Sequence, residues 1–199
     1  MDRPHECATL RGLARSLFAG IIIFGICGEA AAGVRSSTAT RYYSVGGTTK
    51  VSLASSMRSN PFRGDRGGAV ANIRPKYSLK VATSPSGGTC RVTDVDLTIH
   101  FVMTLPRANE GGMAAATRSS WRSFVAFARR HEATHRSIYL QCAQNFLAKA
   151  RQLSGASCGG LQARARQLLN AEDRACDRRH AAFDRSERRR LGGQPLFRR

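Results

Sequence analysis

Residues 90–105, CRVTDVDLTIHFVMTL, alternate between apolar and polar side chains along most of their length. A period of two is typical of a β-strand that buries one face. The alternation slips by one residue between Val92 and Val95, which predicts a β-bulge. The apolar face comprises Val92, Val95, Leu97, Ile99, Phe101 and Met103. We therefore expect a long strand with one face packed against a core.

Two further strands and a short helix are expected upstream of this strand. The segment RYYSVGG, residues 41–47, has the pattern of a short strand with its turn, and residues 53–57 form a short helix. Residues 73–81 form another strand. Pro75 interrupts it and favours an edge position, because proline cannot donate a ladder hydrogen bond. Pairing of these strands predicts a small antiparallel sheet over residues 41–106.

Downstream of the sheet the apolar period changes to that of a helix. Apolar residues recur at spacings of three and four over residues 117–153. After a Gly-rich turn, a second helix is expected over residues 161–189. The predicted fold class is α+β, a small antiparallel sheet followed by a long antiparallel helix pair.

The domain organisation follows from these elements. The folded domain is expected over residues 33–190, with its sheet half at 41–106, its helical half at 117–190, and a basic tail at 191–199. Residues 1–32 have the basic start, the apolar run and the small residues of a secretory signal peptide. The apolar run is about half the roughly 20 residues that span a membrane. An uncleaved anchor is the alternative, but we expect a secreted or periplasmic protein with no transmembrane segment after cleavage.

Four cysteines follow the leader, an even number that suits two disulfides in an oxidising compartment. Three pairings are open in principle. If Cys142 and Cys176 are bridged, the antiparallel helix pair folds at residue 159, inside the Gly-rich turn. This geometry favours Cys142 with Cys176, and hence Cys90 with Cys158.

The stretch HEATH, residues 131–135, places His131 and His135 four residues apart around Glu132. On a helix this spacing puts both imidazoles on one face, where they can bind one Zn²⁺. The adjacent glutamate then reaches the water in the open position. The motif predicts two zinc ligands and the general base of a metallopeptidase. Three arginines beside the proposed dication oppose this interpretation: Arg129, Arg130 and Arg136.

A catalytic zinc ion needs a third protein ligand. In the hairpin model the two histidines face residue 185, so Asp184 is the first candidate. Glu187 and His180 share its helical face and are the alternatives.

Further segments accompany the motif in a fixed order over about residues 41–190. They are Tyr42-Tyr43-Ser44-Val45-Gly46-Gly47-Thr48-Thr49, Cys90-Arg91-Val92, Thr104-Leu105-Pro106-Arg107, Trp121 and Phe183-Asp184. With these segments the chain resembles the bacterial DUF922 family, described as predicted secreted zinc-dependent proteases. The resemblance implies a minimal zincin-like metallopeptidase fold, with His131 and His135 as ligands and Glu132 as catalytic base.

The chain departs from the family pattern after Phe183-Asp184. In the family an aromatic–Asp pair is followed by Thr and then His-Gly, whereas Arg185-Ser186-Glu187 stand here. If that histidine is the family's third ligand, this chain lacks it. If the aspartate is the ligand, the set is complete, and the hairpin geometry favours Asp184.

The leading hypothesis is an exported zinc metallopeptidase that acts on a peptide or protein substrate. The formal net charge of +19 gathers in the last third of the chain and attracts polyanions generally. An alternative is therefore a catalytically degenerate zincin-like module that binds anionic envelope material. Because the basic segment has no interleaved aromatic residues, no specific nucleic-acid partner is expected. A structural protein stapled by disulfides, without zinc, is the third interpretation.

Overall fold

The computed structural model describes residues 33–59, 62–64 and 67–198. The signal peptide expected at residues 1–32 lies outside the described residues. All elements described below belong to one structural unit. Among the helices in the described ranges, none is long and apolar enough to cross a membrane.

The main sheet is mixed, with the long strand β5 (Thr89–Ala108) between two others. β4 (Asn72–Ser86) pairs with β5 in antiparallel orientation, and β1 (Val34–Val45) pairs with it in parallel orientation. The short strand β6 (Ser154–Gly155) pairs with the start of β5. β4, which contains Pro75, ends the path β1-β5-β4, as the proline indicates. The prediction of a purely antiparallel sheet is wrong for β1.

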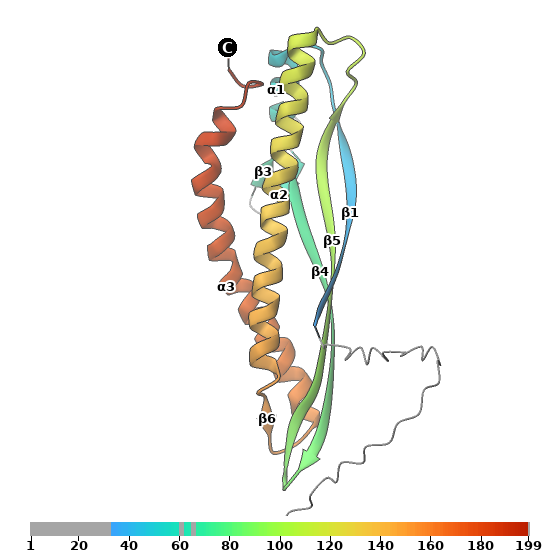
Figure 1. The fold of residues 1–199 in the computed structure, drawn as a ribbon, viewed down its shortest axis with the longest axis vertical. Coiled ribbons are helices and arrows are strands. Elements are labelled where there is room, and N and C mark those ends of the chain that lie inside the picture. Colours follow the sequence, from blue (N-terminus) through green and yellow to red (C-terminus); the bar gives the residue numbers. More distant parts are fainter. Residues whose placement is uncertain (1–32, 60–61, 65–66, 199) are drawn as a thin grey trace, which may run out of the picture. The chain divides into compact units, whose positions relative to one another are not determined.

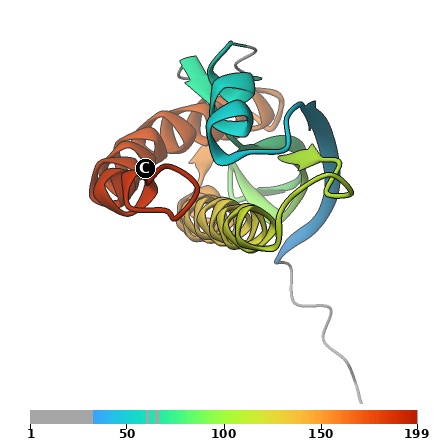
Figure 2. The same ribbon diagram turned by 90° about the horizontal axis from the view of Figure 1, so that it is seen from above.

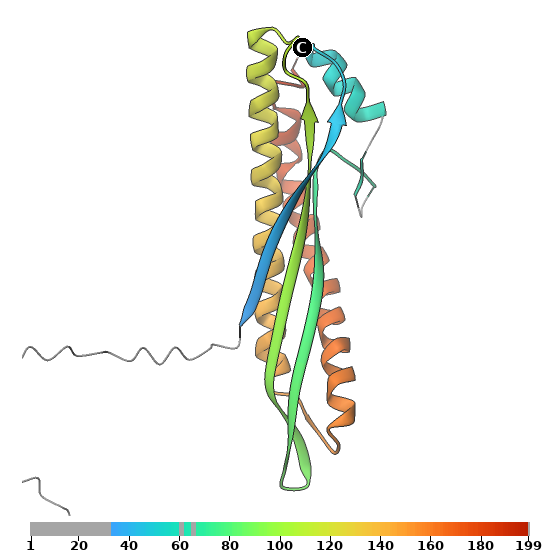
Figure 3. The ribbon, with the colours of Figure 1, turned by 90° about the vertical axis from the view of Figure 1, so that its right-hand side faces the viewer.

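The parallel orientation of β1 follows from the path of the chain (Figure 3). After β1 the chain passes through α1 (Lys50–Ser59) and a small hairpin of β2 (Phe62–Gly64) and β3 (Gly67–Ala69) before it enters β4. A tight turn at Gly87 and Gly88 then reverses the chain into β5. Both glycines have positive φ, 55° and 78°, which such a turn requires. Two reversals therefore return β5 to the direction of β1.

The β-bulge predicted in β5 is confirmed. Ala82 of β4 pairs with Asp94, and the next residue, Thr83, pairs with Val92. Thr93 is thus the extra residue on β5. The bulge shifts the alternation by one position, so the apolar side chains on both sides of it stay on the buried face.

Two long helices, α2 (Ala115–Ala150) and α3 (Gly159–Gly192), run beside the sheet (Figure 1). Within the sheet α2 packs mainly on β5, whereas α3 packs on α2 and also contacts β4 (Figure 2). Phe101 of β5 and Phe146 of α2 are both fully buried in the core between sheet and helices. The observed fold is therefore a mixed α/β structure in which a helical hairpin covers a sheet.

Described residues beyond Leu191, within the segment expected as a basic tail at 191–199, pack against the rest of the domain. α3 continues to Gly192, and Leu196 is only 2% exposed. Phe197 packs edge-on against Phe124 of α2, with ring centroids 5.2 Å apart. Two apolar side chains within the basic segment, Leu196 buried and Phe197 partly buried, thus cover the start of α2.

Two disulfides connect these elements. One joins Cys142 of α2 to Cys176 of α3, and the other joins Cys90 of β5 to Cys158, just before α3. These are the pairings that the hairpin argument favours. The first sets the register of the two long helices, and the second anchors their connection to the sheet.

Substituting Gly47 by alanine is expected to destabilise the protein by about 1–3 kcal/mol. Gly47 has a φ of 115°, and a Cβ atom there would overlap the side chain of Ser52 and lie 3.0 Å from the backbone nitrogen of Leu53. Gly159→Ala is the matched control, because a Cβ atom there would meet no atom within 4 Å. Urea unfolding of both variants measures the difference, and equal stabilities would contradict the prediction.

Candidate metal centre

The centre is built on α2, where His131 and His135 lie one helical turn apart. Their Nε2 atoms approach to 3.1 Å, so both rings point toward the same place. Apolar residues at helical spacing hold this part of α2 against the sheet, and Ala128, one turn before His131, is buried in the core. The helix therefore fixes the level and the face at which both histidines stand.

Asp184 of α3 completes the group. Its Oδ1 atom lies 2.8 Å from Nε2 of His135 and 3.2 Å from Nε2 of His131. Ligand atoms about 2.0–2.1 Å from a tetrahedral zinc ion lie roughly 3.3 Å from one another. The three donor atoms therefore converge as the ligands of one small cation do, and the three residues form a group that could hold a metal ion.

The Cys142–Cys176 disulfide explains why Asp184 meets the two histidines. In an antiparallel pair of helices, one known contact between the two helices determines which residue of the second helix faces each residue of the first. The disulfide supplies such a contact, and Asp184 lies two helical turns beyond Cys176 on the same face of α3. The register expected from the sequence is thus the one observed.

The two alternative ligands have other contacts. His180 Nδ1 lies 2.7 Å from Nδ1 of His135, the ring nitrogen opposite the convergent one. Glu187 accepts a hydrogen bond of 3.0 Å from Arg190. Both border the same pocket, but neither belongs to the convergent group.

Aromatic rings fix the orientation of the two histidines. The Phe183 ring stacks on His131 at a centroid distance of 4.7 Å and meets His135 edge-on at 5.1 Å. The Phe127 ring also lies near His131, at a centroid distance of 6.1 Å. Among the described residues, Nδ1 of His131 is buried and has no hydrogen-bond partner. Ring packing, rather than a hydrogen bond to that nitrogen, therefore orients His131.

Glu132 is buried, with 3% of its surface exposed, and borders the same pocket. Burial raises the pKa of its carboxyl to about 8, and the negative charge of Asp184 adds to this effect. A hydrogen bond with the backbone of Ile73, at the start of β4, acts in the opposite direction. The carboxyl is thus held between α2 and the sheet, beside the three convergent donors.

A pocket of about 500 Å³ opens on these side chains. It is bordered by residues 69–73, which lead into the edge strand β4, and by the facing parts of α2 and α3. The Asp184 side chain is 39% exposed, so the donor group can be reached from solvent. The volume is within the range of sites that bind small molecules or short peptide segments.

The arginines beside the motif point away from the centre. Arg136 donates hydrogen bonds to Thr38 and Ser36 of β1, at 3.1 Å and 2.8 Å. Arg129 donates to the hydroxyl of Tyr42 at 3.4 Å, and Arg130 is exposed. Their charges are directed toward β1 and solvent. Their electrostatic repulsion of a cation at the centre is therefore weak.

The fold and the centre define a mixed α/β protein with a His-Glu-x-x-His helix and a facing aspartate. The chain belongs to the bacterial family DUF922, whose model matches residues 40–193 and is described as a bacterial protein of unknown function. No curated protein and no solved structure matches the chain significantly. The description of the family assigns no activity to its members.

Proposed function

We propose that this protein is an exported zinc-dependent peptidase. The observation that supports this most strongly is the convergence of His131, His135 and Asp184 within 4.8 Å, beside the buried carboxyl of Glu132. Two imidazoles and one carboxylate, with one position left open, are a typical ligand set of catalytic zinc. The two disulfides are consistent with an oxidising compartment outside the cytosol.

When bound, zinc would polarise the scissile carbonyl and lower the pKa of a nucleophilic water. Glu132 would accept the proton from that water and pass it to the leaving amine. Its position suits this role, because it stands next to His131 on α2 and borders the pocket. A carboxyl with a pKa raised toward neutrality is also better matched to proton transfer in both directions.

A peptide or protein segment is the proposed substrate. β4 forms an edge of the sheet, and residues 69–73 border the pocket beside the metal group. An extended peptide could pair with this edge by strand addition, which would hold its backbone across the pocket. Backbone pairing gives affinity for an extended chain without requiring a particular sequence.

A second function, the binding of anionic envelope material by a module without catalysis, is favoured by one feature of α3. Its exposed surface carries four arginines spaced by four, seven and four residues, which places them on one helical face. They are Arg174, Arg178, Arg185 and Arg189. This row would attract a polyanion whether or not zinc is bound.

The two functions are separated by measuring zinc and peptide cleavage together. The purified protein is expected to retain one zinc ion and to cleave a mixed peptide library. Mass spectrometry monitors the cleavage products. A chelator should stop cleavage, and added zinc should restore it. A chain that retains no zinc and cleaves no peptide would refute the peptidase proposal.

Asp184→Asn is expected to lower zinc affinity by more than the roughly 100-fold that substitutions outside the ligand set produce, because it removes a charged ligand. Asp177→Asn is the matched control, since Asp177 also stands on α3 and borders the pocket but does not belong to the convergent group. Competition with a coloured chelator measures both affinities. Equal affinities for the two variants would exclude Asp184 as a ligand.

A further inference from the structure

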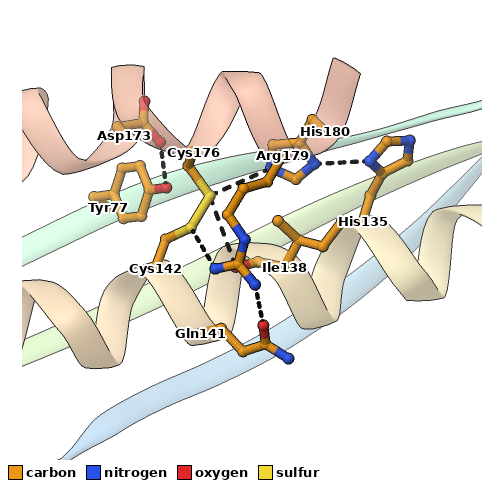
Figure 4. Close-up of a disulfide and its surroundings, with 9 residues drawn as sticks. All are labelled: Tyr77, His135, Ile138, Gln141, Cys142, Asp173, Cys176, Arg179 and His180. Atoms are coloured by element: carbon orange, nitrogen blue, oxygen red, sulfur yellow. Dashed lines mark hydrogen bonds between the residues drawn. A yellow bond between two sulfur atoms is a disulfide. The ribbon is translucent and has the colours of Figure 1, made fainter. Parts of the chain in front are cut away.

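The ring of His135 has contacts at both nitrogen atoms. Nε2 faces Asp184 and His131, and Nδ1 faces Nδ1 of His180 on α3 at 2.7 Å. His180 is 1% exposed, whereas histidines are on average only partly buried. The close-up in Figure 4 shows the His180 ring between His135 and the Cys142–Cys176 disulfide.

The two contacts of His135 determine where its proton must be. A metal-binding Nε2 has to offer its lone pair, so the proton of the neutral ring stands on Nδ1. That N–H donates to Nδ1 of His180, which must therefore be the accepting nitrogen. The proton of His180 then stands on its own Nε2, which faces Sγ of Cys176 at 3.7 Å. With a cation held at Nε2 of His135, this arrangement of neutral rings satisfies the contact between His135 and His180 and the contact of His180 with Cys176.

His180 is itself held in place from two sides. It stands one helical turn from Cys176, which the disulfide ties to Cys142 of α2 (Figure 4). Its ring also packs on the ring of Tyr139, with centroids 4.1 Å apart. Tyr139 belongs to α2, and Cys176 is covalently bonded to α2. The accepting nitrogen of His180 therefore has a fixed position relative to His135.

We propose that His180 is a positioning residue, which accepts the Nδ1–H hydrogen bond of His135 and so directs Nε2 of that ring toward the metal. This inference rests on the proposed zinc site. Hydrogen bonds to the far nitrogen of a metal-binding histidine fix its tautomer and orientation, and their loss commonly lowers metal affinity by roughly 10–100-fold. His180 therefore acts on the metal through His135, without being a ligand.

The proposal is tested by two substitutions at position 180 and one control. His180→Phe keeps a ring against Tyr139 but removes the acceptor. His180→Asn places an amide oxygen close to where Nδ1 stands and keeps the acceptor. His100→Phe removes an exposed histidine of β5 that is remote from the centre and bonds to Ser37. Circular dichroism and urea unfolding establish that each variant is folded before zinc is added.

Zinc affinity, measured by chelator competition, is expected to fall roughly 10–100-fold in His180→Phe. His180→Asn should recover most of this loss, and His100→Phe should match the wild type. With Co²⁺ as the probe, His180→Asn should keep the visible absorption spectrum of the wild type, because no ligand has changed.

The other possible results separate a failure of the proposed zinc site from a failure of the positioning role of His180. If the wild type binds neither ion, the proposed function and this inference both fail. If the wild type binds zinc and His180→Phe binds it equally well, only the positioning role is refuted. If His180→Asn alters the Co²⁺ spectrum, His180 is a ligand and the proposal is also overturned.

Discussion

Glu132→Gln is expected to lower peptide turnover by at least about 10²–10⁴-fold while the bound zinc is kept. Glutamine has nearly the same shape as glutamate but cannot accept the proton of the attacking water. Because Glu132 lies outside the group of His131, His135 and Asp184, its substitution removes no proposed ligand. In the metal-free protein the substitution also removes a carboxyl whose pKa burial raises, so the folded apoprotein should be at least as stable as the wild type at neutral pH.

The experiment needs zinc content and turnover from the same preparation. Glu187→Gln is the matched control, since Glu187 also borders the pocket and its carboxylate accepts a hydrogen bond from Arg190 on the same helix. The control should keep both zinc and turnover near the wild-type level. Full turnover in Glu132→Gln would refute the general-base role, and loss of zinc in that variant would show that Glu132 is itself part of the metal site.

Removal of the Cys142–Cys176 disulfide by a double serine substitution is expected to destabilise the protein by about 4 kcal/mol. The bridge closes a segment of 34 residues, and its loss restores conformational entropy to the unfolded chain. Zinc affinity should fall as well, because the bridge holds α3 in the register that brings Asp184 to the histidines. Urea unfolding and chelator competition measure the two effects.

The matched control is the double serine variant of Cys90 and Cys158. This bridge closes a longer segment, with a separation of 68 residues, so its stability loss should be at least as large. It lies at the connection before α3, away from the centre, and zinc affinity measured under folding conditions should be nearly unchanged. Equal losses of affinity in both double variants would show that global destabilisation, rather than helix register, accounts for the effect.

Local periodicity predicted the elements whose side chains alternate between core and solvent. The bulge in β5 could be placed because one slip in the alternation marks one extra residue. β1 was harder, since the residues from Val34 to Thr40 are largely polar and exposed and show no apolar alternation. Its direction is set by two chain reversals that local periodicity does not encode. The sheet was therefore expected to be antiparallel.

The position of Asp184 in the site could be predicted because it follows from one disulfide. Pairing Cys142 with Cys176 places Asp184 at the level of the histidines, and the structure has that register. The proposed role of His180 cannot be deduced from spacing, because spacing gives the face of a helix but not which ring nitrogen a neighbouring side chain contacts. Phe183 belongs to a sequence motif, but its spacing does not indicate that its ring packs against both histidines.

The donors of the centre come from two helices, and the closest pair, His135 and Asp184, is 49 residues apart in the chain. An ion held there would bridge α2 and α3, so only a chain whose helical hairpin has closed can retain it. A chain in which Cys142 is joined to Cys158 would displace α3 and separate the donors. Zinc retention would therefore distinguish correctly oxidised molecules from mispaired isomers.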